Sequence, residues 1–342
     1  MGFRYPQRLR ARRARGGCLM PKAPPMLSIC LPVYNGQRYL RAAVESLLSQ
    51  TFSDFELVIC DNASADATES ICRELAARDS RIRYYRNARN LGAAPNFNRA
   101  ADLARGQYVR WASHDDLWAP TAMQRCIEVL ERDPTVICCH GRTVVIDEHG
   151  QPVPTYDDSR MPAPSPRHVP QRLLYDPPRQ LDSDHPAERL RDLLLHTHWC
   201  FEIFGIIRRS QLLRTSLHGS YYGSDKVLLA ELAMMGRTVV LDEPLFFRRD
   251  HAGNSTSIRT HRERAEWMDT SLNGKLRRPH LKLLAGYHRA IRRGEGTMAQ
   301  KLGCYRVLAA WMMQFRKFKN VVRESDQENT APDLPAGVAV KQ

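Results

Sequence analysis

The sequence has 342 residues, of which 51 are Lys or Arg and 37 are Asp or Glu, so its formal net charge is +14. This length suffices for one large domain with an appendage, or for two domains. The positive charge gathers near the ends: Arg4 to Lys22 holds seven basic residues, and Lys275 to Lys319 holds twelve against one acidic residue, Glu295. The middle has no basic stripe interleaved with aromatic residues, which argues against a nucleic-acid partner.

The two basic segments predict contact with an anionic membrane surface, although solvated charge explains them equally well. No run of about 18 apolar residues occurs, so we expect no membrane span, and the N-terminus lacks the apolar core of a signal peptide. The nine cysteines form no CxxC pair and lie mostly in apolar runs, which indicates reduced, buried thiols. We therefore expect a cytoplasmic protein, peripheral on the inner face of the membrane.

From Met26 onward, short apolar runs alternate with amphipathic stretches, a pattern typical of βαβ units around a mainly parallel sheet. Polar clusters follow three of the predicted strands, with the sequences YNG, DNAS and SHDD. Because open α/β sheets bind ligands beyond the carboxyl ends of their strands, we expect the site there. The pattern predicts strands at 27–33, 55–60, 82–85 and 107–113, and helices at 36–50, 67–77 and 95–104.

The second half begins with a Pro-rich stretch at about 150–186, which we predict to be a flexible or functional loop. After residue 257 the pattern becomes helical and basic. Residues 297–319 read as an amphipathic helix, which either lies on a membrane surface or docks on the body. Between these regions the sequence predicts helices at 188–196 and 225–235, and strands at 203–209, 238–241 and 244–249.

Three segments carry a resemblance to a known family: LPVYNGQRYLRAAVESLLSQTFSDFELVICDNAS, NARNLGAAPNFNRA and ARGQYVRWASHDD, in this order. Together they resemble the family 2 glycosyltransferases with the GT-A fold, over residues 27 to about 256. The resemblance implies an α/β fold with a Rossmann-like, mainly parallel sheet flanked by helices, here with a C-terminal helical appendage. It also implies an inverting, hexosyltransferase-type enzyme. Such an enzyme moves a sugar from a nucleoside-diphosphate sugar to a sugar or lipid-linked sugar acceptor, in polysaccharide or glycolipid synthesis at the cell surface.

The predicted domains follow from this resemblance. A glycosyltransferase domain at 26–257 consists of a nucleotide and metal half, 26–150, and an acceptor half, 151–257. A basic, disordered segment at 1–25 precedes it, and a basic helical appendage at 258–322 and a disordered tail at 323–342 follow it.

The strongest candidate site is the pair Asp115 and Asp116, which follows the strand at 107–113. A departing nucleoside diphosphate gains negative charge, and Mg²⁺ or Mn²⁺ can offset it while bound to one or two carboxylates. The alternative is an ordinary acidic cluster before a helix that begins near Pro120. Family members commonly carry an acid where Ser113 stands, so the sequence leaves open which aspartate binds the metal directly.

The resemblance also assigns donor contacts, in the loops after the first strands and in the later segment FFRRDHAGNST. In that segment we expect Arg249 and His251 to offset the charge of the diphosphate, and Arg248 to face solvent. For Asn90 and Gly92, in the turn NLG, a role in forming the turn explains these residue types equally well. The donor-binding residues implied are Pro32, Tyr34, Asn35, Asp61, Asn62, Asn90, Gly92, Asp115, Arg249 and His251.

Asp225 matches the family's general base, an acidic residue that opens a helix about 100 residues after the metal motif. The alternative is that Asp225 caps this helix together with Ser224. Trp199, Phe201 and Glu202 are candidates for the acceptor pocket, or for the core. Two rival functions remain: a catalytically inactive scaffold or regulatory subunit, and a sugar nucleotidyltransferase, for which YNGQRYL lacks the glycines of a phosphate loop.

Overall fold

The computed structural model describes residues 23–153, 180–196, 200–255, 258, 260–274 and 279–314. The predicted N-terminal segment, most of the Pro-rich loop, Trp199 and the predicted tail lie outside the described residues.

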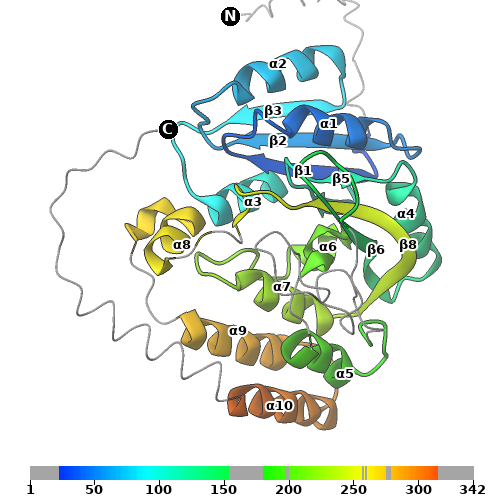
Figure 1. Ribbon diagram of the computed structural model, residues 1–342. Coiled ribbons are helices and arrows are strands. Elements are labelled where there is room, and N and C mark those ends of the chain that lie inside the picture. The colour runs from blue at the N-terminus through cyan, green and yellow to red at the C-terminus, as the bar shows by residue number, and fades with distance from the viewer. Residues whose placement is uncertain are drawn as a thin grey trace, which may run out of the picture.

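Within this part of the chain, eight strands form one sheet in the order β3-β2-β1-β4-β7-β6-β8-β5 (Figure 1). The first four strands pair in parallel, as the alternating pattern predicts. Every residue of β1 and β2 is buried, because helices cover both faces of this part of the sheet. These strands are β1 (Leu27–Val33), β2 (Phe55–Asp61), β3 (Ile82–Arg86) and β4 (Tyr108–Trp111).

The two faces of the sheet carry separate hydrophobic cores. Leu27, Ile29 and Leu31 of β1 point into one core, and Cys30 points into the other, following the two-residue period of a strand. The first core is closed by α1 (Leu40–Leu48), α2 (Thr68–Arg78) and α4 (Ala122–Arg132). The second is closed by α3 (Ala93–Asp102), α5 (Pro186–Arg191), α7 (Ser224–Ala233), α9 (Pro279–Arg293) and α10 (Met298–Met313).

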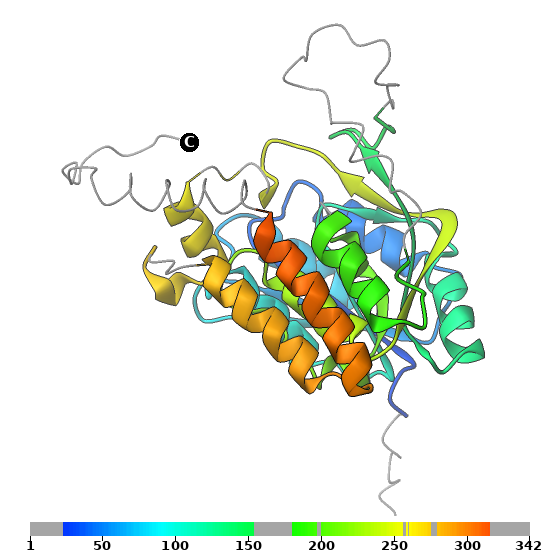
Figure 2. The same ribbon diagram turned by 90° about the horizontal axis from the view of Figure 1, so that it is seen from below.

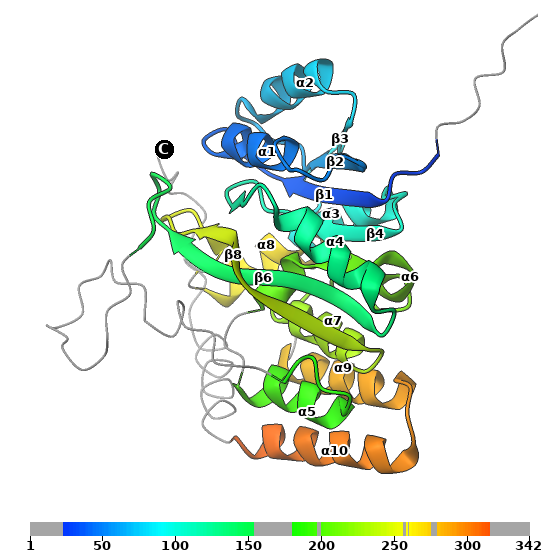
Figure 3. The same cartoon turned by 90° about the vertical axis from the view of Figure 1, so that its right-hand side faces the viewer.

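The second half of the sheet is mixed rather than mainly parallel. β7 (Ile206–Arg208) runs antiparallel to both β4 and β6 (Val136–Ile146), while β6 and β8 (Arg237–Arg249) lie side by side in parallel (Figure 3). The short strand β5 (Leu117–Trp118), which we did not predict, pairs antiparallel with β8.

Two predicted strands differ from the structure. The strand expected at 203–209 is shortened, because a 3₁₀ turn at Phe201–Phe204 takes up its first part. The strands expected at 238–241 and 244–249 are one strand, β8, whose pairing with β6 shifts register on either side of Arg142, the partner of Pro244. Proline has no N–H to donate, so an irregular ladder is expected at this point.

The helices after β8 pack against the body of the protein. α8 (His261–Met268) lies against α3, and α9 and α10 lie side by side along α7 and α5 (Figure 2). One side of α10 is buried through Cys304, Val307, Leu308 and Trp311. The other side is exposed and carries the apolar side chains of Met298, Leu302, Met312 and Met313, so the helix docks on the body but is not amphipathic over its described length. Within the described part of the chain, no helix combines the length and apolar composition needed to cross a bilayer.

Candidate active site

A cavity of about 1140 Å³ opens beyond the carboxyl ends of β1, β2 and β4. Its walls come from the loops that follow these strands, from the start of α7, from the segment after β8 and from α8. The site residues predicted from the sequence that line it are Pro32, Tyr34, Asn35, Asn62, Asn90, Gly92, Asp115, Asp116, Asp225 and His251. Asp61 and Arg249 do not line it.

Asp115 and Asp116 lie in the short loop between β4 and β5, with 8% and 4% of their surfaces exposed. Arg249, at the end of β8, holds this loop from behind. Its main-chain N–H donates to Asp116 Oδ1 at 2.8 Å, and its Nε donates to the carbonyl oxygen of Asp115 at 2.8 Å. The pairing of β5 with β8 therefore positions both carboxyl groups.

The two carboxyl groups have pKa values that are shifted in opposite directions. Burial raises the pKa of Asp116 well above its usual value, and the charge of Asp115 raises it further. At Asp115, burial also acts to raise the pKa, but the hydrogen bond with His251, the His114 ring and the Ser113 hydroxyl outweigh it and hold the pKa well below its usual value. Two adjacent buried carboxyl groups are poorly compensated without a nearby cation.

These residues fit a divalent ion. Among the described residues, no three His, Cys, Asp or Glu side chains gather closely enough to hold a metal by themselves. Mg²⁺ in nucleotide sites, however, takes one or two carboxylates and completes its shell with phosphate oxygens and water. The pair Asp115 and Asp116 supplies this number of ligands.

His251 is fixed beside the pair. Its Nε2 lies 2.9 Å from Asp115 Oδ2, and the Gly253 N–H donates to its Nδ1 at 3.1 Å. Since Nδ1 accepts, we assign the ring proton to Nε2, which then donates to Asp115. The side chain of Asn254 also accepts from the main-chain N–H of His251 at 2.6 Å.

The side chains of Arg248 and Arg249 have the opposite orientations to those predicted. Arg249 is buried and donates to the carbonyl oxygens of Asp115, Asp147 and Glu148, so its guanidinium group supports loops and does not face the cavity. Arg248, which we expected to face solvent, is 8% exposed and lines the cavity. Strand alternation correctly separated the two side chains but could not show which of them points inward.

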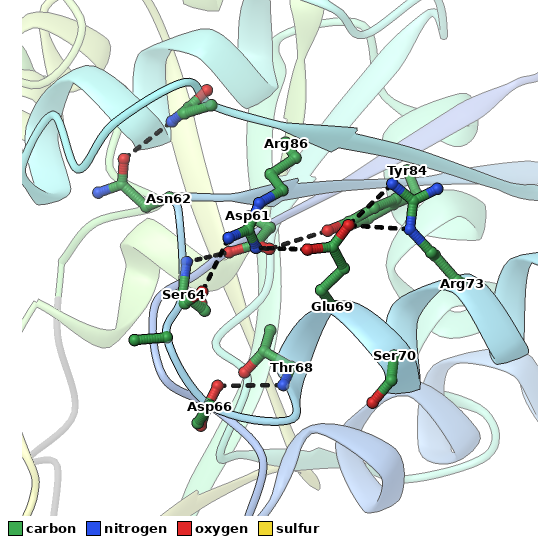
Figure 4. Close-up of polar contacts among 12 residues, drawn as sticks. Asp61, Asn62, Ser64, Asp66, Thr68, Glu69, Ser70, Arg73, Tyr84 and Arg86 are labelled. Carbon is green, nitrogen blue, oxygen red and sulfur yellow. Dashed lines mark hydrogen bonds and ion pairs between the residues drawn. The ribbon is translucent and has the colours of Figure 1, made fainter.

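Asp61 does not contact the cavity, because its carboxylate is used inside the protein (Figure 4). It is fully buried and accepts hydrogen bonds from the Ser64 N–H at 2.8 Å, the Tyr84 hydroxyl at 2.8 Å and Arg86 Nη1 at 2.5 Å. Arg86 also donates to the Ser64 carbonyl oxygen and pairs with Glu69. The expected role in base recognition is therefore replaced by a role in holding the loop after β2.

Asn62 lines the cavity, yet its amide is fully engaged by the protein. Its Nδ2 donates to Asn90 Oδ1 and to the Gly92 carbonyl oxygen, and its Oδ1 accepts from Asn87 Nδ2 and the Leu91 N–H. An amide has two donors and two acceptor positions, so none remains to recognise a base edge. Asn62 instead shapes the turn at 90–92.

Gly92 is required at this turn. Its φ is +90°, and an added Cβ would lie 2.5 Å from the Asp269 Cα just after α8. The turn is thus pressed against the end of α8, where Thr270 also donates to the Asn90 carbonyl oxygen at 3.0 Å.

The loop after β1 is joined to the loop after β2 by hydrogen bonds. The Asn35 N–H donates to Ser64 Oγ at 2.9 Å, the Ala65 N–H donates to Asn35 Oδ1 at 2.9 Å, and the Gly36 N–H donates to Thr68 Oγ1 at 2.8 Å. These bonds hold Asn35 in a left-handed conformation, with φ of 51°. The ring of Tyr34 remains 45% exposed in the cavity.

Asp225 is the second residue of α7 and lines the cavity. The helix is preceded by Gly223, at φ of 84°, which has no side chain to cap it. The capping role that we considered for Asp225 is found in part, because Asp225 Oδ1 accepts from the Lys226 N–H in the first turn at 3.0 Å. Burial raises the pKa of Asp225, against the opposing effects of the Lys226 N–H and the Lys226 charge.

Comparison with known proteins identifies the first half of the chain. The family model described as "Glycosyl transferase family 2" matches residues 28–191. A chondroitin synthase of Escherichia coli is 35% identical over 129 residues, 38% of this chain and 19% of that protein. The putative glycosyltransferase EpsE of Bacillus subtilis is 33% identical over 127 residues, 37% of this chain and 46% of that protein. The matched segment thus spans less than half the length of these relatives.

Solved structures extend the similarity in fold beyond that segment. S. aureus TarS in complex with UDP-GlcNAc has a TM-score of 0.58 at 17% identity, covering 84% of this chain and 71% of that chain. TarS in complex with UDP has a TM-score of 0.56 at 16% identity, covering 84% and 70%. The mixed sheet flanked by helices, with helices at its C-terminal end, is therefore similar in fold to the TarS structures, and residues 28–191 of the chain match the family model of glycosyl transferase family 2.

Proposed function

We propose that the protein transfers a sugar from a nucleoside-diphosphate sugar to an acceptor hydroxyl, with inversion at the anomeric carbon. One observation carries this proposal. A single cavity brings together a pair of buried carboxyl groups, Asp115 and Asp116, and a third carboxyl group with a raised pKa, Asp225. A glycosyl transfer that depends on a divalent ion needs both of these features.

The donor nucleotide is proposed to lie against the loops after β1 and β2. Tyr34 offers an exposed ring face for the base, and the main chain at Pro32 and Asn35 lies beside it in the cavity lining. The turn at Asn90 and Gly92 forms the adjoining wall. UDP and UDP-GlcNAc in complex with TarS, which shares this fold, support a nucleotide or nucleotide sugar as the ligand.

Asp115 and Asp116 would hold Mg²⁺ or Mn²⁺, and the ion would supply positive charge to the departing diphosphate. His251 orients Asp115 through its hydrogen bond, and Arg249 fixes the loop that carries both aspartates. Arg248 adds a guanidinium group to the cavity wall, where it can offset further charge on the leaving group.

Asp225 is proposed to take the proton of the acceptor hydroxyl. Burial raises its pKa, which makes the carboxylate a stronger base than one in water. A single displacement follows: the acceptor oxygen forms a bond to the anomeric carbon, the bond to the diphosphate oxygen breaks, and the configuration inverts.

The test is release of nucleotide from a panel of UDP, GDP, CDP and dTDP sugars, with and without Mn²⁺ or Mg²⁺. We expect metal-dependent release, and we expect it to fall at least a hundredfold in the double variant Asp115→Ala, Asp116→Ala, because the charge compensation for the leaving group is lost. Asp242→Ala, which removes a carboxylate with 92% of its side chain exposed, is the control and should retain the full rate. A wild-type protein without metal-dependent release from any donor would instead support the inactive scaffold.

We further propose that the protein works at the inner surface of a membrane, in the synthesis of a cell-surface polysaccharide or glycolipid. The described part of α9 and α10, residues 279–314, holds six Lys or Arg against Glu295, which Arg214 already neutralises. Several apolar side chains of the same two helices face outward: Leu281, Met298, Leu302, Met312 and Met313. Apolar and basic side chains together are typical of surfaces that bind anionic lipid.

A further inference from the structure

Exposed aromatic and exposed aliphatic side chains are separated on the surface of this protein. Among the described residues, the large hydrophobic side chains that are strongly exposed include three aromatic ones: Tyr34 at 45%, Tyr222 at 45% and Trp267 at 40%. All three line the cavity. None of the exposed aliphatic side chains does; these are Leu213, Val240, Leu281, Met298, Leu302, Met312 and Met313.

Tyr222 and Trp267 belong to a different wall from Tyr34. Tyr222 comes three residues before Asp225, in the loop that leads into α7, and Trp267 lies in the last turn of α8. Arg264 of α8 connects the two elements, because its guanidinium carbon lies 4.9 Å from the centre of the Tyr222 ring. Tyr222 therefore lies against α8 just before the helix that carries the proposed base, and Trp267 lines the same cavity from α8.

Hydrogen bonds hold the two segments of this wall that carry the rings, which are the loop before α7 and the end of α8. The Ser220 hydroxyl donates to the Asp269 carboxylate, which joins the loop before α7 to the end of α8. Asn98 of α3 bonds both the N–H and the carbonyl oxygen of His218, in the same loop, at 2.9 Å each. Rings that are pre-positioned lose little conformational freedom when a ligand stacks on them.

We propose that Tyr222 and Trp267 form a stacking platform for a saccharide acceptor. This inference rests on the proposed function and specifies its acceptor. A pyranose ring has a face of C–H groups that packs on the negative face of an aromatic ring, and an edge of hydroxyl groups that needs polar partners. Lys226 and Glu266 line the cavity near the platform and supply such partners. At about 1140 Å³, the cavity exceeds the size usual for one small ligand, so a sugar acceptor fits beside the donor.

The chemistry of the lining favours a sugar over a purely lipid acceptor. An acyl chain would need a continuous, accessible aliphatic lining. The aliphatic side chains of Val33, Ile203 and Met268 line this cavity but are buried, and the strongly exposed ones lie outside it. Aromatic rings interleaved with charged side chains instead match a ligand that is apolar on its faces and polar on its edges.

The experiment compares Trp267→Ala and Tyr222→Ala with the wild type. The acceptor probes are p-nitrophenyl β-glycosides of glucose, galactose and N-acetylglucosamine, with the donor that the nucleotide-release panel identifies. We expect each alanine variant to raise the KM for the acceptor about tenfold, the upper value for loss of one aromatic stacking contact. Trp267→Phe and Tyr222→Phe should restore most of the affinity, because each keeps a ring face.

Three controls separate stacking from misfolding and from failure of the proposed function. Donor hydrolysis without acceptor, and thermal stabilisation by the nucleotide sugar, should stay within twofold of wild type in all four variants. Leu213→Ala, at a side chain that is 48% exposed but outside the cavity, should change neither the acceptor KM nor donor hydrolysis.

An unchanged acceptor KM in both alanine variants, with donor hydrolysis intact, would overturn the platform and leave the proposed function standing. The saccharide assignment would also be wrong if wild type hydrolyses its donor but neither transfers to these glycosides nor binds them in ligand-observed NMR. Absence of donor hydrolysis and of nucleotide binding in wild type would refute the proposed function itself.

Discussion

At the scale of single residues, Asp225 is a site where activity and stability conflict. Burial raises its pKa, so the folded protein binds a proton there more tightly than the unfolded chain does. Stability from this group is therefore greatest below the unfolded pKa and is lost as pH rises through the higher folded pKa. The same burial increases basicity, which the proposed proton transfer requires.

Asp225→Asn should accordingly lower the transfer rate by about 10² to 10⁴-fold, the usual contribution of a general base. It should also raise the melting temperature at pH 7 relative to wild type, and raise it less at pH 4, where the wild-type carboxyl is closer to neutral. Rate assays together with melting curves at the two pH values test this. An Asn variant with wild-type rate would exclude Asp225 as the base.

Gly92 offers a second prediction for a single residue. Its positive φ disfavours any other residue, and the nearby main chain of Asp269 leaves no room for a Cβ. Gly92→Ala should destabilise the protein by about 1–3 kcal/mol and weaken donor binding, since the added Cβ displaces the end of α8. Gly150→Ala is the matched control: its φ is also positive, at 85°, but the nearest atom to an added Cβ is Arg249 Nη1 at 3.7 Å. Urea unfolding should show a smaller loss for Gly150→Ala, of about 1 kcal/mol. Equal losses would mean that crowding at Gly92 does not matter.

At the scale of elements, α10 carries apolar side chains on its exposed side as well as on its buried side. Its inner side is buried, while Met298 and Leu302 are 82% and 55% exposed. Leu302→Asp should weaken binding to vesicles of phosphatidylcholine and phosphatidylglycerol about tenfold, because an apolar contact is replaced by a charge of the same sign as the lipid. Leu213→Asp, at a leucine 48% exposed outside these helices, is the control. Equal binding of wild type and Leu302→Asp in a co-sedimentation assay would contradict a membrane role for this face.

The sequence predicted elements well where periodicity decides them. β1 to β4 and the helices between them are confirmed, since buried apolar runs and helical spacing fix both type and order. The antiparallel direction of β7 and the two-residue strand β5 were missed. A three-residue strand has no pattern that indicates its direction, and two residues are too few for any period.

The sequence predicted some residues of the candidate site correctly and others wrongly, again according to whether a sequence pattern fixes their position. Asp115, Asp116 and Asp225 do line one cavity, because their positions follow from strand and helix ends. Asp61 does not line the cavity. The pairing of β2 with β3 places it opposite Arg86, with which it forms an ion pair, and the sequence does not reveal this register. Tyr222 and Trp267 were also not predicted as site residues. An aromatic residue is normally assigned to the hydrophobic core unless its exposure is known.

At the scale of the whole molecule, the cavity depends on chain segments far apart in sequence. The segment that matches the family ends at residue 191, whereas Asp225, His251 and α8 complete the walls. Gly92 and Asp269 are in direct contact across this distance. The predicted division at 257/258 stays a prediction, but α8, on the far side of it, is part of the cavity wall.

The ion pair of Asp61 and Arg86, in which the carboxylate is fully buried and the Arg86 side chain is 32% exposed, has a practical consequence for handling the protein. Dissolved salt weakens attractions between charges in water, but it has little access to a carboxylate with no exposed surface. Under the proposed binding to anionic lipid, a concentrated salt wash should therefore release the protein from vesicles while the loop after β2 keeps its shape. The proposed attachment could then be reversed by salt without loss of the structure that surrounds the cavity.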